Sequence, residues 1–202
     1  MMMKTLYYIH DPMCSWCWGF ANTWNEVQAA LKNHVEIHYV VGGLAPDSDT
    51  PMLMDMQLVL QNTWRKIEST IPGISFNYDF WSECQPRRST YPACRAVLAA
   101  KKQNHEKFMV DAIQKAYYQE ARNPSDLSTL IAIADQSSMN VERFKEDVLS
   151  NQIERELQEN IILSRQLGAE GFPSLVLVSG SSQSLLRLDY NSVDATLKQI
   201  LA

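Results

Sequence analysis

The chain has 202 residues, of which 46% are hydrophobic and 20% are charged, a balance typical of a soluble globular protein with a core of its own. The formal net charge of −5 argues against nucleic acid or an anionic membrane as the main partner. No apolar run approaches the roughly 18 residues that a membrane-spanning helix needs.

The N-terminal sequence is used to predict the cellular compartment of the protein. Met1-Met2-Met3-Lys4 leads directly into a predicted strand, without a basic region, a long apolar stretch and a small-residue cleavage site. We therefore expect a cytoplasmic protein. In that reducing compartment the four cysteines need not form structural disulfides, and a closely spaced pair is more typical of a catalytic or redox-sensing site.

Residues 5–44 are predicted to form a strand, a helix and a second strand. The first strand covers 5–10, and the helix runs from about 14 to 32 with apolar residues spaced along one face. Residues 34–41 are rich in β-branched and aromatic side chains, which predicts the second strand. Gly42-Gly43 ends it.

Two cysteines, Cys14 and Cys17, lie where the first predicted strand runs into the first helix. Free backbone N–H groups and the helix dipole would stabilise a Cys14 thiolate there, and the thiolate is the nucleophile of disulfide exchange. Zinc sites use the same spacing, but the separation of Cys84 and Cys94 is not a recurrent zinc-ligand spacing. At a strand–helix junction near a βαβ pattern, the pair predicts a redox site.

Residues 50–167 are predicted to be almost entirely helical. Thr50 and Pro51 offer an N-cap and a first helical residue for a helix that runs to about Ile71, followed by a loop through Pro86. The later helices are predicted at 92–104, 106–120, 126–136, 141–150 and 152–167, with Ser125 and Asn140 as caps and Gly168 as a stop.

The C-terminal part returns to strands. An apolar strand is predicted at 174–178, turn residues at 179–182, and a second hairpin strand at 185–188. Asn191 or Ser192 would cap a last helix that ends at Leu201. The order βαβ, helical block, ββα predicts an α/β domain interrupted by a large helical insertion.

Two segments together resemble the DsbA-like branch of the thioredoxin superfamily. They are most similar to its cytosolic group described as predicted protein-disulfide isomerases. The segments are Asp11-Pro12-Met13-Cys14-Ser15-Trp16-Cys17-Trp18-Gly19-Phe20 and Gly171-Phe172-Pro173-Ser174-Leu175. The resemblance implies a thioredoxin-like α/β fold (βαβ…ββα) with a large all-helical insertion. We expect a discontinuous thioredoxin-like domain, 1–44 and 168–202, and a helical insertion domain, 45–167.

The resemblance also implies roles for individual residues. Cys14 would be the attacking thiol and Cys17 the resolving one, with Ser15-Trp16 as the dipeptide between them. Pro173 would be a cis-proline facing the pair, and the backbone of Phe172 would bind an extended substrate peptide. The implied substrates are protein or peptide thiols and disulfides. No metal or bound organic cofactor is expected, and glutathione is a candidate redox partner.

The sequence departs from the family at two places that affect proton transfer. Tyr8 stands where periplasmic relatives carry a buried acid, and the Ser15-Trp16 dipeptide has no histidine. His10 and Asp11 are then the nearest candidates for carrying a proton to Cys17. The direction of electron flow does not follow from the resemblance.

Alternatives to thiol–disulfide exchange remain open. One is a glutathione-dependent transferase or isomerase of the kappa or 2-hydroxychromene-2-carboxylate isomerase type, and another is a binding or adaptor protein. Met52, Met56, Leu60, Trp64 and Ile67 recur at helical spacing, which indicates core packing or the wall of a substrate cleft.

Four further side chains are predicted to lie outside the chemistry. Cys84 and Cys94 are predicted to be structural cysteines, and Arg87 and Arg88 to face solvent.

Overall fold

A computed structural model describes residues 4–32 and 34–201. Residues 1–3, 33 and 202 lie outside the described residues. The Met1-Met2-Met3 start considered above is among them, as are the outer ends of the predicted ranges 1–44 and 168–202.

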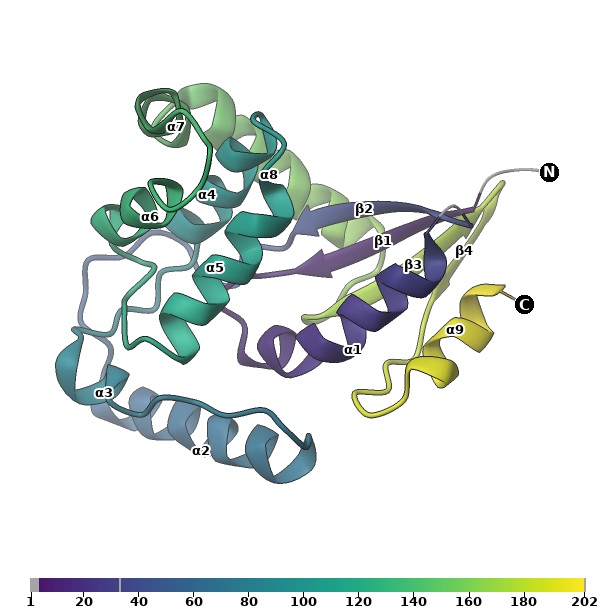
Figure 1. The fold of residues 1–202 in the computed structure, drawn as a ribbon, viewed down its shortest axis with the longest axis horizontal. Coiled ribbons are helices and arrows are strands. Elements are labelled where there is room, and N and C mark those ends of the chain that lie inside the picture. The colour runs from purple at the N-terminus through teal and green to yellow at the C-terminus, as the bar shows by residue number, and fades with distance from the viewer. Residues whose placement is uncertain (1–3, 33, 202) are drawn as a thin grey trace.

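A four-stranded mixed sheet runs through one half of the molecule in the order β2-β1-β3-β4 (Figure 1). Strand β1 (Thr5–His10) pairs in parallel with β2 (Glu36–Val41) and antiparallel with β3 (Ser174–Ser179), which pairs antiparallel with β4 (Ser182–Leu185). A parallel pair needs a crossover connection, and α1 (Ser15–Leu31) supplies it. The sheet therefore joins the two ends of the chain.

Helices cover both faces of the sheet. Because successive strand residues point to opposite faces, Leu6 and Tyr8 of β1 pack with α1 and α9 (Val193–Leu201) on one side. Ile9 packs on the other side with residues that follow α8 (Asn151–Gln166) or belong to its last turn. The start of α1 thus emerges from a strand that is buried on both faces.

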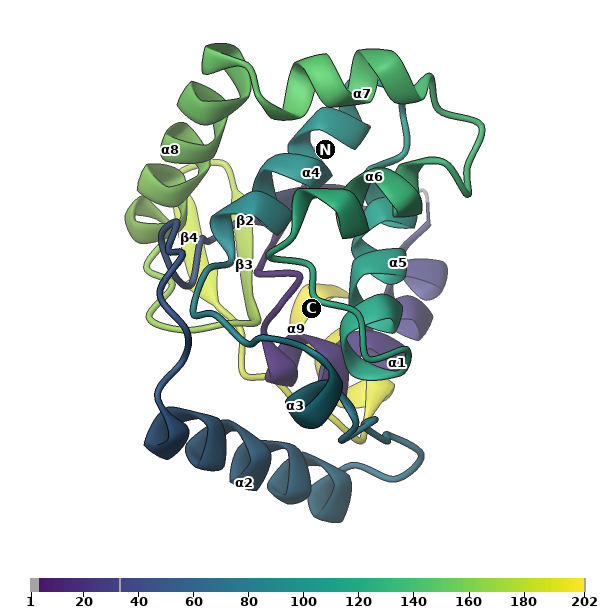
Figure 2. The same cartoon turned by 90° about the vertical axis from the view of Figure 1, so that its left-hand side faces the viewer.

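A second core lies among the helices between β2 and β3, and it is built from aromatic and aliphatic side chains. Besides α8, these helices are α2 (Met54–Thr70), α3 (Phe80–Glu83), α4 (Tyr91–Lys101), α5 (Glu106–Tyr118), α6 (Leu127–Ala134) and α7 (Val141–Val148). Figure 2 shows α2 on its own side of the molecule, with α3 beside it and α6 and α7 at the opposite end. No helix in the described part of the chain is both long and apolar enough to cross a bilayer.

The predicted start of the long helix after β2 is wrong. The helix begins at Met54 rather than at Pro51, and its N-cap residue is Leu53 rather than Thr50. Pro51 instead forms a β-bridge with Arg87, and the amide of Met52 donates to the Pro86 carbonyl at 2.8 Å. Pro51 and Met52 therefore pair with the loop before α4 instead of forming the first turn of the helix.

The predicted second hairpin strand at 185–188 is also misplaced. Strand β4 ends at Leu185, and the turn is shortened to Gly180 and Ser181, where Gly180 adopts a positive φ of 60°. Leu186, which the sequence places in the strand, is buried with α1 and α9. Its amide still donates to the Leu175 carbonyl of β3 at 2.8 Å, but its side chain packs against the helices.

Caps are confirmed at some helix ends and not at others. Asn140 accepts a hydrogen bond from a backbone amide of α7, and Gly168 follows α8 with a φ of 76°. The predicted cap Ser125 is wrong, because Asp126 occupies that position before α6. The Ser125 hydroxyl donates instead to the Ser89 carbonyl at 2.7 Å.

Candidate active site

The two cysteines of the motif lie at the first turn of α1. Cys14 is the N-cap residue in an extended conformation, with φ −82° and ψ 121°. Its amide donates to the Asp11 carbonyl at 3.0 Å, which closes the turn between β1 and α1. Cys14 is 7% exposed and Cys17 is fully buried. The strand–turn–helix geometry therefore places one thiol, only slightly exposed, at the start of the helix and the other one turn deeper.

A cis peptide bond faces this turn. The bond joins Phe172 to Pro173, and the Phe172 carbonyl accepts a hydrogen bond from Cys14 Sγ at 3.4 Å. The two residues that make this contact are 158 positions apart in the chain. Gly42 lets the Phe172 ring approach, because a Cβ at that position would collide with the ring. The structure thus brings together the predicted pair Cys14 and Phe172–Pro173.

The two thiols differ in acidity. The hydrogen bond from the Cys17 thiol is the largest cause that lowers the pKa of Cys14, helped by backbone amides of the first turn and opposed by burial and by the charge of Asp11. Burial raises the pKa of Cys17 well above the ordinary thiol value, and its donation to Cys14 adds to this. Cys14 is therefore the thiol that ionises first.

We expect iodoacetamide to alkylate Cys14 ahead of the other three cysteines at neutral pH. Its pKa is lowered, so its reactivity should persist as the pH falls below the ordinary thiol pKa, whereas the raised pKa of the more exposed Cys84 should suppress reaction there. Peptide mass spectrometry of the protein labelled across a pH series measures this order. Faster labelling of Cys84 than of Cys14 at neutral pH would contradict the assignment.

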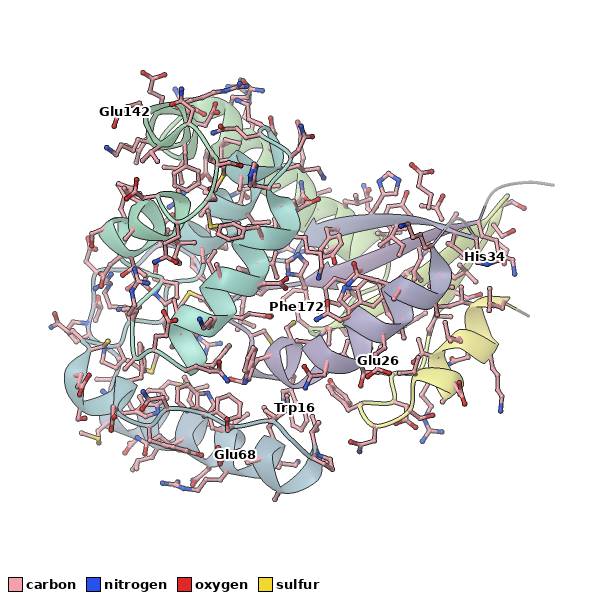
Figure 3. All side chains as sticks on the ribbon, viewed as in Figure 1. Trp16, Glu26, His34, Glu68, Glu142 and Phe172 are labelled. Atoms are coloured by element: carbon pink, nitrogen blue, oxygen red, sulfur yellow. The ribbon has the colours of Figure 1, made fainter. Side chains whose placement is uncertain are left out.

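Helix α2 contacts the dipeptide between the cysteines. The indole N–H of Trp64 donates to Ser15 Oγ at 3.0 Å. The Trp16 ring lies edge-on to Tyr190, with centroids 5.3 Å apart, and Lys66 Nζ lies 5.9 Å from the same ring. Figure 3 shows Trp16 between α1 and α2. Sequence patterns predicted Trp64 as a core or cleft residue, but nothing local indicated that it would bind Ser15.

A cavity of about 330 Å³ opens beside Cys14. Its walls come from the loop before α1, the loop after β2, helix α2 and the segment before α4, and include Met13, Leu44, Met52, Leu60, Arg87 and Arg88. The predicted apolar stripe therefore divides. Met52, which precedes α2, and Leu60 of α2 line the cavity, whereas Trp64 and Ile67 belong to the buried core. Core packing is therefore correct for Trp64 and Ile67, and a cavity wall is correct for Met52 and Leu60.

One of the two arginines departs from its predicted surroundings. The Arg87 side chain is only 15% exposed and pairs with Asp126, so the expectation that it faces solvent is wrong. Arg88 is exposed, as predicted. The ion pair holds Arg87 at the cavity wall, where its guanidinium and that of Arg88 contribute positive charge to a mostly apolar space.

The two residues considered as proton carriers are both fully buried, but they are held differently. Neither ring nitrogen of His10 has a hydrogen-bond partner among the described residues, and its ring is stacked on Tyr8 with centroids 5.1 Å apart. Burial lowers the pKa of His10 to about 3, so the ring is neutral at neutral pH. His10 therefore makes no side-chain hydrogen bond within the described residues, whereas Asp11 accepts several.

The other two cysteines lie apart from each other. Cys84 donates to the Ala121 carbonyl at 2.9 Å, and the buried Cys94 lies 3.5 Å from an Asp11 carboxylate oxygen. No cluster of three or more His, Cys, Asp or Glu side chains in residues 4–32 and 34–201 is arranged to hold a metal ion. The zinc alternative therefore has no ligand set in this part of the chain.

Comparison with known proteins places this geometry in a family. A family model described as thioredoxin matches residues 7–193. The structure is similar to that of a candidate protein disulfide isomerase from Nitrosomonas europaea, with 28% identity and a TM-score of 0.85, covering 98% of this chain and 96% of that one. The predicted thioredoxin-like α/β fold is thereby confirmed.

Two further relatives are more distant. The cytosolic disulfide reductase DsbM from Pseudomonas aeruginosa shares 22% identity with a TM-score of 0.74, covering 91% of this chain and 89% of DsbM. The same protein has also been solved with GSH. The ClpXP adapter protein SpxH from Bacillus subtilis is 27% identical over 174 residues, which are 84% of this chain and 56% of SpxH. The chain thus spans little more than half the length of that relative. The family model covers residues 7–193, and this match shows that the protein belongs to the thioredoxin family.

Proposed function

We propose that the protein is a thiol–disulfide oxidoreductase in which Cys14 exchanges a disulfide with a substrate and Cys17 resolves the intermediate. The observation that carries the proposal is the surroundings of Cys14. Cys14 is the N-cap residue of α1, its pKa is lowered mainly by the hydrogen bond from Cys17, and its sulfur lies 3.4 Å from the Phe172 carbonyl oxygen that precedes the cis-proline. Family membership supports the same chemistry.

The exchange balances without a bound cofactor. The Cys14 thiolate attacks one sulfur of a substrate disulfide, the substrate S–S bond breaks, and the leaving thiolate takes up a proton. Cys17 then loses its proton and attacks Cys14 Sγ, which releases the second substrate thiol. The substrate gains two electrons and the cysteine pair becomes a disulfide. The reverse sequence oxidises a substrate dithiol.

The proposed substrates are disulfides and thiols of proteins or peptides. The cavity beside Cys14 is apolar on several walls, and an extended peptide could pair with the backbone near Phe172. DsbM is described as a cytosolic disulfide reductase, which supports a reductive role in the cytoplasm. The Nitrosomonas protein is described as a candidate isomerase, which supports isomerisation as a second reaction of the same pair.

Glutathione is the proposed small-molecule redox partner. DsbM has been solved with GSH, and in this chain Arg87 and Arg88 line the cavity that opens beside Cys14. Guanidinium groups suit the carboxylates of glutathione, whose thiol could then reach Cys14. The glutathione-dependent transferases and isomerases considered above usually keep a single reactive residue at the Cys14 position, whereas this chain keeps both cysteines at the first turn of α1. Redox exchange is therefore favoured over that alternative.

A protein-binding role is the second candidate. The relatives named SpxH are adapters of ClpXP. In this chain Leu53, Met54 and Leu58 expose large apolar side chains at the start of α2, and Leu53 is 78% exposed. Binding of a protein partner that is unchanged in the Cys14→Ser variant would favour this role over exchange.

The Cys17→Ala variant tests the proposed exchange directly. It should accumulate a stable mixed disulfide at Cys14 when mixed with a peptide that contains a disulfide, because no resolving thiolate remains to release it. A parallel sample with glutathione disulfide should gain one glutathione at the same residue. Intact-mass and peptide mass spectrometry detect both products. Cys14→Ala is the matched control and should form neither, and a Cys17→Ala protein that forms no adduct would refute the proposal.

A further inference from the structure

Asp11 is a fully buried carboxylate that gathers hydrogen bonds from separate segments. Its Oδ1 accepts from the Met13 amide at 2.8 Å, and its Oδ2 accepts from the Leu44 amide at 2.7 Å and from the Thr90 hydroxyl at 2.6 Å. The Cys94 thiol lies 3.5 Å from the same Oδ2. These donors come from the loop before α1, the loop after β2, the residue before α4, and α4 itself.

A buried carboxylate is costly unless other groups satisfy it. Asp11 forms no ion pair with the charged side chains that the structure describes, so neutral donors alone offset the lost hydration. Such an arrangement is expected where the carboxylate has a functional role that an apolar residue could not fill. The location of its hydrogen-bond partners indicates that role.

Three of the partners form walls of the cavity beside Cys14. Met13, Leu44 and Thr90 all line it, although they belong to segments up to 77 residues apart in sequence number, from 13 to 90. Asp11 also holds the cysteine turn through its main chain, since its carbonyl accepts from the Cys14 amide at 3.0 Å. One residue therefore sets the position of the reactive cysteine relative to the opposite walls of the cavity.

The charge of Asp11 acts on the thiols as well. It raises the pKa of both Cys14 and Cys17, against the lowering that the helix start and the hydrogen bond between the thiols produce at Cys14. The other titratable groups around Cys14 or its cavity are neutral or positive at neutral pH: Cys17, Tyr8, Tyr117, Tyr118, Tyr190, Arg87 and Arg88. Among these groups, Asp11 supplies the negative charge.

We propose that Asp11 is a positioning residue for thiol exchange, which fastens the Cys14 turn to the loop after β2 and to the start of α4 and restrains the Cys14 thiolate by its charge. The positioning part rests on the proposed function. The effect on the Cys14 thiolate does not, because it is measured without a substrate.

Asp11→Asn separates the two effects, since asparagine keeps the size of the side chain and one carbonyl acceptor but removes the charge. Its amide group cannot accept from all the donors, so the cavity walls should loosen and insulin reduction should slow by roughly tenfold. Loss of the charge should speed alkylation of Cys14, although insulin reduction slows. Cys14 should react roughly threefold faster with iodoacetamide at neutral pH, which corresponds to a pH midpoint of alkylation about half a unit lower.

Two sets of control variants separate the loss of a hydrogen-bond donor from the loss of the Asp11 charge. Thr90→Val removes a donor but keeps the charge, so it should slow insulin reduction without lowering the alkylation midpoint, and Thr90→Ser should restore the rate. Glu142→Gln removes an exposed charge from α7, far from Trp16 and Phe172 in Figure 3, and should change neither value.

The outcomes separate failure of this inference from failure of the proposed function. If the pH midpoint of Cys14 alkylation is unchanged or higher in Asp11→Asn, the proposed role of the charge is overturned. If Asp11→Asn does not fold, a Thr90→Val rate equal to that of the wild type would overturn the positioning role. A wild-type protein that reduces no insulin would refute the proposed function and the positioning role that depends on it. The alkylation midpoints would still decide whether Asp11 restrains the thiolate.

Discussion

Replacing Cys14 with serine is expected to reduce the rate of insulin reduction by dithiothreitol to that measured without protein. Exchange requires a thiolate nucleophile, and a serine hydroxyl does not ionise at neutral pH. The start of α1, the Cys17 thiol and the Phe172 carbonyl surround the sulfur at this position, and a hydroxyl there cannot form a disulfide. Precipitation of reduced insulin, followed by turbidity, measures the rate.

Cys84→Ser is the matched control for that experiment. Cys84 is half-buried, donates to the Ala121 carbonyl and does not line the cavity, and a serine hydroxyl can make the same hydrogen bond. This variant should therefore reduce insulin at the wild-type rate. Equal rates for the wild type and Cys14→Ser would show that the motif does not carry the reaction.

Trp64→Ala is expected to lower the free energy of unfolding by about 3–5 kcal/mol, the usual cost of removing a fully buried large aromatic side chain. Trp64 is 0% exposed and is stacked on Phe76 with centroids 4.8 Å apart. Its ring also contacts those of Trp81 and Tyr118, at 4.9 and 5.6 Å, so the substitution leaves a cavity where α2 meets α3 and α5. Urea titration followed by circular dichroism measures the change.

Two other variants show which contact of Trp64 matters. Leu58 lies on the outer face of the same helix and is 48% exposed, so Leu58→Ala should change stability by no more than about 0.5 kcal/mol. Trp64→Phe keeps an aromatic ring but removes the N–H that donates to Ser15, and its loss should be smaller than that of Trp64→Ala. A loss below about 1 kcal/mol in Trp64→Ala would contradict the packing described here.

Much of the fold could be predicted because local patterns and tertiary packing agree there. Strand β1, helix α1 and strand β2 lie within a few residues of their predicted positions, and their apolar faces are the buried ones. The prediction failed at the start of α2 and in the last hairpin. At both places a residue contacts a segment distant in sequence: Pro51 pairs with Arg87, and the Leu186 side chain packs with α1.

Within the candidate site, the predictable part is the part that is local in sequence. The spacing of Cys14 and Cys17 at a strand–helix junction is enough to place one thiol at a helix start. The resemblance to a known family, rather than any local pattern, pointed to Phe172 and Pro173 as the facing residues. Asp11 could be named only as a nearby acid, because its donors Leu44 and Thr90 are remote in sequence.

The sequence by itself determined the two thiols, their position at the start of α1 and the order of elements around them. Periodicity and helix-end chemistry act over a few residues, so those features can be recognised locally. Only the tertiary structure decided what surrounds the Cys14 sulfur: the Phe172 carbonyl, the Trp64–Ser15 hydrogen bond and the buried Asp11 with its donors. These contacts join segments that meet only when the sheet and the helical core pack together. They form walls of the cavity beside Cys14, and among them the charge of Asp11 raises the pKa of Cys14 against the local lowering by Cys17.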